Sequence, residues 1–360
     1  MTGRRDFLQA TGAGLLAARR WQPAATDRRS AFSLWTWVHG GAREVDLAGW
    51  RTRYARLRAS GFTGVLVSGG EAAMHGEAAH AEGLVLHRWI WTMNRSGDAT
   101  VKAEHPEWFS VSREGRSSLT HPPYVGYYQW LCPTRRAVRE YLAGVVDGVA
   151  ATPGVDAVHL DYIRHPDVIL PRNLWETYGL VQDHEMAPFD FCYCEACRDR
   201  FARETGRDPL ALEDPAADVA WRAFRWRMVT ETVEVLARAV HARGKAISAA
   251  VFPTPTIARR LVRQAWDRWP LDVVFPMTYH GFYVEPVSWI EGAVAEGVTA
   301  LPTATPLVAG LYLPDLPPPA LAEAIRAARR GGASGVAMFE AGGLTDAHLA
   351  AVREVLQEAG

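Results

Sequence analysis

The chain has 360 residues, 48% of them hydrophobic, and a formal net charge of −1 at pH 7. This balanced charge gives no general attraction to nucleic acid or to anionic membrane surfaces. No apolar run approaches the roughly 20 residues that a membrane-spanning helix needs. The balanced charge and the lack of a long apolar run lead us to expect neither a nucleic-acid partner nor an integral membrane segment. The length fits two average domains or one large α/β barrel.

The N-terminal segment differs in composition from the rest of the chain. Arg4 and Arg5, with a Phe-Leu step just after them, precede the small and weakly apolar residues 10–18. This pattern resembles a twin-arginine export signal. A disordered basic tail stays open as the alternative. We predict an export signal over residues 1–28, a catalytic domain over residues 29–360, and a periplasmic or extracellular location.

After this segment, short apolar runs alternate with amphipathic stretches that are typical of helices. Several of the runs follow a glycine of the kind that ends a helix before a strand. The eight predicted strands are Ala31–His39, Gly61–Gly69, Gly83–Met93, Val155–Arg164, Lys245–Phe252, Leu271–Tyr279, Val298–Thr305 and Ser334–Glu340. Eight strands that alternate with helices predict a parallel sheet closed into a (β/α)8 TIM barrel.

Two long loops follow the third and fourth predicted strands, at about residues 94–133 and 165–215. The chain's four cysteines all lie in these loops, one in the first and three in the second: Cys132, Cys192, Cys194 and Cys197. A C-x-C-x-x-C run with one distant partner is typical of a tetrahedral zinc site, and four thiolates leave no open position for catalysis. We predict a structural zinc ion (Zn2+) that ties the loops together. Two disulfides, or unpaired buried thiols, stay open as alternatives.

Two carboxylates at predicted strand ends are the leading catalytic candidates. Asp161 closes the fourth strand, and side-chain alternation directs it toward the barrel axis. Arg164 is near enough in sequence to pair with Asp161 and keep it ionised. Glu340 closes the eighth strand in the phase of Val336 and Met338, which we interpret as a second inward phase. We predict that Glu340 is the acid and Asp161 the nucleophile, base or charge stabiliser. Two alternatives stay open: Asp161 pairs with Arg164 only to fix the loop, and Glu340 only caps a loop.

Further polar and aromatic residues lie at the same predicted strand ends. Active sites of such barrels lie at this face, and flat aromatic rings suit the stacking of sugar rings. The substrate-binding candidates are Arg164, Tyr279, His280, Trp35, Trp37, His39, His87, Trp91 and Asp190, the last also a reserve carboxylate.

Several other chemistries lack their usual sequence patterns. The chain has no G-x-x-x-x-G-K-[ST] loop, no G-x-G-x-x-G after a strand, no H-E-x-x-H and no G-x-S-x-G elbow. Phosphate, dinucleotide, metalloprotease and esterase chemistry are therefore disfavoured. Inward carboxylates beside aromatic side chains are the equipment of a glycoside hydrolase.

Three segments carry a specific resemblance to a known group. The run Leu131-Cys132-Pro133, the run Arg139–Leu142 and the strand Val155–Arg164 together resemble the glycosyl-hydrolase-like family 10 group. Ala157 stands where that group usually has glycine, and His165 where it usually has tyrosine. The resemblance implies an exported (β/α)8 barrel that acts on a carbohydrate.

The cysteine set is similar to the zinc-binding cysteines of glycoside hydrolase family 42 β-galactosidases. Tyr162 and Ile163 follow Asp161 where that family has an Asn-Glu acid/base pair, so the resemblance implies the zinc site and not the galactosidase activity. The sequence predicts an exported glycoside hydrolase for an oligo- or polysaccharide. A glycan-binding barrel without hydrolysis, or a sugar lyase or isomerase with His280 or His39 as base, stays open.

Overall fold

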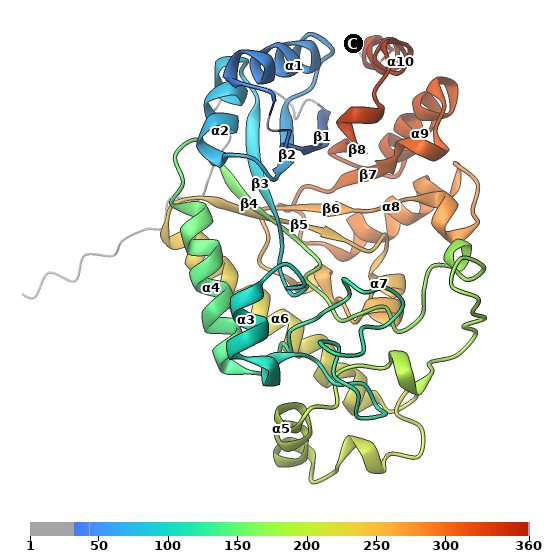
Figure 1. Cartoon of the computed structure of the whole chain (residues 1–360). Coiled ribbons are helices and arrows are strands. Elements are labelled where there is room, and N and C mark those ends of the chain that lie inside the picture. The colour runs from blue at the N-terminus through green and yellow to red at the C-terminus, as the bar shows by residue number, and fades with distance from the viewer. Residues whose placement is uncertain (1–31, 43, 359–360) are drawn as a thin grey trace, which may run out of the picture.

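The computed structural model describes residues 32–42 and 44–358. The predicted export signal lies outside these described residues. Within them, eight parallel strands pair in the order β6-β5-β4-β3-β2-β1-β8-β7, each flanked by helices (Figure 1). The strands are β1 Ser33–His39, β2 Gly64–Ser68, β3 Val85–Trp91, β4 Ala157–Asp161, β5 Ala246–Val251, β6 Val273–Pro276, β7 Val308–Tyr312 and β8 Gly335–Phe339. Isolated parallel bridges between Val274 and Leu307 and between Met277 and Gly310 join β6 to β7. The prediction of a (β/α)8 barrel is confirmed.

A helix follows each strand and covers the outside of the barrel. These helices are α1 Leu47–Ala59, α2 Ala72–Ala81, α4 Arg136–Ala150, α6 Val219–Ala242, α7 Pro255–Val262, α8 Trp289–Ala300, α9 Pro318–Arg330 and α10 Asp346–Gln357. Side-chain caps define several helix starts: Asp46 accepts from the Gly49 N–H, and Thr345 accepts from the His348 N–H. No helix of the described residues is long and apolar enough to cross a membrane.

The prediction for the seventh strand was wrong. Residues 298–300 are the last turn of α8, and the strand begins only at Val308. Residues 298–300 are exposed, so the apolar character of this segment does not reflect burial in the sheet. A short apolar run does not by itself distinguish a strand from a turn of helix.

The two long loops lie side by side at one end of the molecule, as predicted (Figure 1). The loop after β3 carries α3 Ala99–Glu104, and the loop after β4 carries α5 Glu195–Thr205. A bridge between Ser112 and Phe191 pairs the two loops directly. This pairing brings Cys132 and the later cysteines into one region.

Large side chains fill the barrel interior. Trp35, Trp37 and Phe275 form the centre of an inner cluster that is separate from the outer core between sheet and helices. Gly64 makes room for the indole of Trp35, because a Cβ at Gly64 would lie 2.2 Å from that ring. Polar groups in the interior are paired: His87 Nδ1 and His159 Nδ1 each lie 2.9 Å from Ser248 Oγ. The floor beneath the strand ends is therefore closed.

Candidate active site

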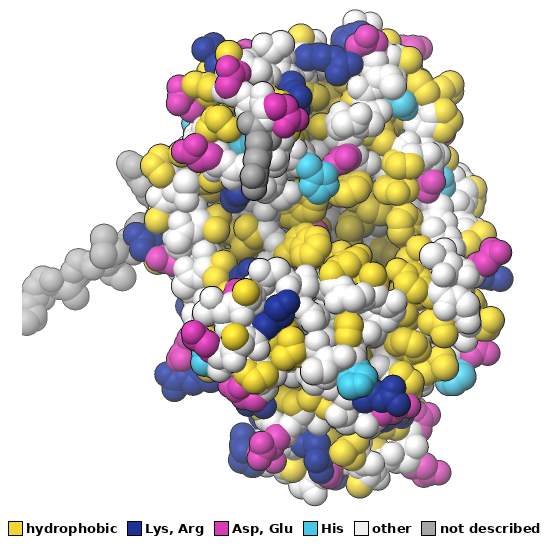
Figure 2. Space-filling view, viewed as in Figure 1, with side chains coloured by type: hydrophobic (Ala, Val, Ile, Leu, Met, Phe, Trp, Pro, Cys, Tyr) yellow, Lys and Arg dark blue, Asp and Glu magenta, His cyan; other side chains and the backbone are white. Residues whose placement is uncertain are grey.

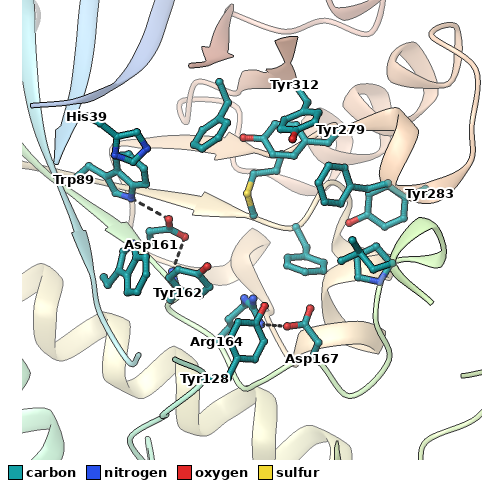
Figure 3. Close-up of a pocket in the computed structure, with 17 residues that line it drawn as sticks. His39, Trp89, Tyr128, Asp161, Tyr162, Arg164, Asp167, Tyr279, Tyr283 and Tyr312 are labelled. Carbon is teal, nitrogen blue, oxygen red and sulfur yellow. Dashed lines mark hydrogen bonds and ion pairs between the residues drawn. The ribbon is translucent and has the colours of Figure 1, made fainter. Parts of the chain in front are cut away.

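A cavity of about 450 Å³ opens at the carboxyl ends of the strands. Figure 2 shows hydrophobic side chains gathered around a hollow in the middle of this face. The lining is mostly aromatic, with two carboxylates, one guanidinium and one imidazole (Figure 3): His39, Trp89, Trp91, Tyr128, Asp161, Tyr162, Arg164, Asp167, Pro171, Leu174, Phe252, Met277, Tyr279, Phe282, Tyr283, Tyr312 and Phe339. Such a concave, apolar site with few polar groups is typical of small-molecule and sugar binding.

Asp161 is held at the cavity wall by two hydrogen bonds to its carboxylate. The Trp89 Nε1–H donates to Oδ2 at 2.9 Å, and the backbone N–H of Tyr162 donates to Oδ1 at 2.6 Å (Figure 3). Tyr162 has a φ of +50°, in the left-handed region that a bulky residue rarely adopts. Backbone strain of this kind costs on the order of 1 kcal/mol or more and is concentrated at functional sites.

Burial raises the pKa of Asp161 above its ordinary value. The hydrogen bonds from Tyr162 and Trp89 offset part of this effect, and the charge of Arg164 offsets less. The carboxyl is therefore suited to hold a proton at a pH where an exposed aspartate would be ionised. This corrects the expectation that Asp161 is the ionised partner of an arginine.

Arg164 forms its ion pair with Asp167 and not with Asp161. Arg164 Nη1 donates to Asp167 Oδ2 at 2.8 Å, and both side chains are buried. The guanidinium also lies over the rings of Trp130 and Phe252. This pair fixes the start of the loop after β4 and places one neutralised charge pair in the cavity wall.

The sequence-based phase of β8 was wrong. Val336 and Met338 belong to the outer core, whereas Ala337 and Phe339 face the barrel interior. The carboxylate of Glu340 does not line the cavity; it accepts from His39 Nε2 at 3.0 Å and lies 37% exposed. His39 itself lines the cavity and packs on Trp89 with ring centroids 5.0 Å apart. Glu340 therefore reaches the cavity only through His39.

The other predicted residues divide into two groups. Tyr279, Trp91, His39 and Arg164 line the cavity, where a substrate could reach them. The remaining predicted side chains lie elsewhere: Trp35, Trp37, His87, His280 and Asp190. The two tryptophans and His87 fill the barrel below the cavity. Every second side chain of a strand points to the barrel axis, along the whole strand and not only at its carboxyl end.

Asp190 has a structural role in a buried charge cluster. It pairs with Arg225 and accepts a hydrogen bond from the Tyr193 hydroxyl at 2.6 Å, and Arg263 lies 3.6 Å away. Burial alone would raise the pKa of Asp190, but Arg225 and Arg263 together lower it. This carboxylate is held ionised and away from the cavity.

Sequence reasoning missed most of the aromatic lining and Asp167. Trp89 alternates with His87 and Trp91 along β3, and this phase could have identified it as inward-facing. Tyr312 ends the true seventh strand, so the misplaced strand concealed it. Tyr128 and Asp167 lie in the long loops, where the sequence carries no periodic signal.

The four cysteines of the two long loops come together. Their Sγ atoms all lie within 4.8 Å of one another, every side chain is buried, and none forms a disulfide. Cys132 Sγ lies 3.4 Å from Cys197 Sγ and 3.5 Å from Cys194 Sγ. The predicted clustering is confirmed. Aromatic side chains such as Phe191 and Trp221 enclose the group.

Comparison with known proteins defines the class of fold. No family model and no curated protein matches the chain. The catalytic domain of β-amylase from Paenibacillus polymyxa is similar at 12% identity and a TM-score of 0.61, over 92% of this chain and 99% of that one. The glycoside hydrolase domain of PgaB (BpsB) from Bordetella bronchiseptica gives 12% and 0.64, over 90% and 99%. A chitinase from Chromobacterium violaceum gives 12% and 0.50, over 91% and 99%. The chain thus has the fold of glycoside hydrolase barrels.

Proposed function

We propose that this protein is a glycoside hydrolase that cleaves an oligo- or polysaccharide, with Asp161 as the general acid. One observation carries the proposal. The Asp161 carboxyl lies at the carboxyl end of β4, in an aromatic-lined cavity, with a pKa raised by burial. A general acid needs a proton that it holds near the working pH and releases in the transition state. The similarity in fold to glycoside hydrolase domains supports this reaction class.

In the proposed reaction, Asp161 transfers its proton to the glycosidic oxygen while the bond from that oxygen to the anomeric carbon breaks. A water molecule attacks the anomeric carbon and gives its proton to a base. The products are two sugars with free hydroxyl groups, and one water is consumed. Aromatic walls exclude bulk water from the reacting atoms and strengthen the electrostatic interactions there.

The pair of His39 and Glu340 is the proposed base. His39 lines the cavity, and the Glu340 carboxylate holds its Nε2–H at 3.0 Å. The ring then carries its lone pair on Nδ1, which lies 3.3 Å from Ser68 Oγ and would exchange this contact for one to the attacking water. Glu340 thereby becomes a positioning residue, and the acid role moves from Glu340 to Asp161.

We also propose that the cysteine cluster binds one structural zinc ion. Zinc–sulfur bonds of about 2.3 Å in a tetrahedral shell set the sulfurs about 3.8 Å apart. The observed separations of 3.4 and 3.5 Å and the common limit of 4.8 Å fit such a shell. The Val111 N–H and the Thr134 hydroxyl, at 3.3 and 3.0 Å, supply hydrogen bonds to Cys192 and Cys197. Zinc here would support the loops that carry the cavity lining.

Export is a further proposal, and it rests on the Arg4-Arg5 motif. Replacement of both arginines by lysine should retain the protein in the cytoplasm, as fractionation and immunoblotting would show. Unchanged export of the double variant would contradict a twin-arginine signal.

The hydrolase proposal is tested by screening the purified protein against neutral, amino and acidic glycans, with reducing-end and mass-spectrometric detection. Asp161→Asn should lower the rate by about 10²- to 10⁴-fold, the usual contribution of a general acid. Asp156→Asn is the matched control, because Asp156 lies at the opposite end of β4. Glu340→Gln should reduce kcat less than Asp161→Asn. Full activity of Asp161→Asn, or binding of a glycan without any cleavage, would contradict the proposal.

A further inference from the structure

Two exposed aromatic side chains stand beside the cavity mouth. Trp91 is 39% exposed and Tyr127 is 42% exposed, and the other large exposed hydrophobic side chains among the described residues are valine or leucine. The two rings contact each other, with centroids 5.8 Å apart and planes inclined by 35°. Because folding normally removes such rings from water, a contiguous pair at one place indicates a binding surface.

The position of the pair connects it to the proposed acid. Trp91 ends β3 and is the register neighbour of Asp161 on β4. It lines the cavity and packs edge-on against Tyr162, with centroids 4.9 Å apart. Tyr127 lies farther out, in the loop after β3, and does not line the cavity. The pair therefore continues the cavity wall outward from the reacting carboxyl.

The surface is held in place from below. Tyr127 packs on Tyr128, which packs on the buried Trp130, with centroid distances of 5.2 and 4.7 Å. The Gln129 side chain donates to the Leu119 carbonyl at 2.8 Å, and the Gln129 carbonyl accepts from the Arg95 N–H at 2.9 Å. A preformed surface loses little conformational entropy when a ligand binds.

We propose that Trp91 and Tyr127, the outer platform, bind a sugar unit of a chain whose scissile bond lies at Asp161. The occupant is a glycan chain because the platform is continuous with the cavity and offers ring faces without a charged group of its own. This inference rests on the proposed function and deepens it: the substrate is an oligo- or polysaccharide that extends past the cavity, not a small glycoside. Trp91 would contact sugar units both in the cavity and on the outer platform, and Tyr127 only those on the outer platform.

The test separates chain length from catalysis. Isothermal titration measures the Kd of the full protein for cello-, chito-, xylo- and malto-oligosaccharides of two and six units, in an Asp161→Asn background that prevents turnover. For a hexasaccharide that binds, Tyr127→Ala should raise the Kd by about threefold to tenfold, the range of one aromatic contact. The Kd for the matching disaccharide should stay constant. Tyr127→Phe should restore tight binding of the hexasaccharide, and Leu210→Ala, which removes a remote exposed side chain, should change neither.

An equal effect of Tyr127→Ala on both lengths, no effect on either, or no binding of any hexasaccharide would overturn the platform. A dimer that this substitution dissociates in sedimentation would assign the surface to a second copy of the chain and overturn it as well. Hydrolysis of a glycan without dependence on Tyr127 would remove only the platform. Length-dependent binding that needs Tyr127, with no cleavage by the unsubstituted protein, would remove only the hydrolase proposal.

Discussion

The cysteine cluster and the Asp161 cavity both include residues of the two long loops, yet the surroundings of their polar groups differ. In the cluster, four buried sulfurs face one another and receive further hydrogen bonds from Val111 and Thr134. In the cavity, a single carboxyl is left among aromatic rings with a raised pKa and no ion-pair partner among the described residues. The first arrangement is closed and serves stability. The second is open to the cavity, and the raised pKa of its carboxyl suits it to hold a proton.

This difference predicts that metal loss and loss of the carboxyl act on different properties. Chelation of the proposed zinc, or Cys194→Ser, should strongly destabilise the fold, because structural zinc contributes on the order of 10 kcal/mol of apparent binding energy. Differential scanning calorimetry with and without a chelator measures the effect, and elemental analysis gives the zinc content. Asp161→Asn is the control and should keep its zinc. A metal-free protein with an unchanged Tm would contradict the closed site.

The Arg164–Asp167 pair gives a second test, since it lies in the cavity wall but is closed like the cluster. Arg164→Met leaves a buried carboxylate without its partner, which should cost about 3–5 kcal/mol of unfolding free energy. Arg136→Met, which breaks the exposed pair with Glu140, should leave the free energy of unfolding nearly unchanged. Urea unfolding compares the two. If both substitutions lowered the free energy of unfolding equally, the buried description of the Arg164–Asp167 pair would be wrong.

The ionisable carboxyl of Asp161 should lower the free energy of unfolding as the pH rises. Its pKa is raised in the folded state, so both states are protonated at low pH and its ionisation opposes folding as the pH rises. Asp161→Asn cannot ionise and should become more stable than the unsubstituted protein above the folded pKa. The gain should be about 1.4 kcal/mol for each unit by which the pKa is raised. Thermal melts at pH 4 and pH 8 measure it, with Asp156→Asn as control. The prediction would be contradicted if the stability of Asp161→Asn relative to the unsubstituted protein fell between pH 4 and pH 8.

Sequence reasoning reached the features that depend on local spacing. The strand periodicity gave the barrel, the alternation in β4 directed Asp161 inward, and the cysteine spacing gave the cluster. It failed where a choice depends on three-dimensional packing. The partner of Arg164 is Asp167, three residues farther along, and the path of the loop decides which of the two nearby aspartates it meets.

The predictions for β7 and β8 both relied on the pattern of apolar residues alone. That pattern did not distinguish the end of α8 from a strand at residues 298–305, and it did not show which face of β8 points to the barrel interior. Both errors changed the site, since the first concealed Tyr312 and the second placed Glu340 in the cavity. The aromatic surroundings of Asp161 come from the ends of β3, β4, β5, β6, β7 and β8 and from the long loop after β3, and only the fold brings them together.

We infer that burial in an open aromatic cavity raises the pKa of the Asp161 carboxyl above that of an exposed aspartate. This inference is tested most directly by carbon-13 NMR titration of the aspartate carboxyl groups, with the Asp161 resonance assigned by its loss in Asp161→Asn. This measurement needs no knowledge of the substrate. We expect a pKa clearly above the ordinary value of about 3.9. A pKa at or below that value would show Asp161 ionised under working conditions and would contradict its role as the acid.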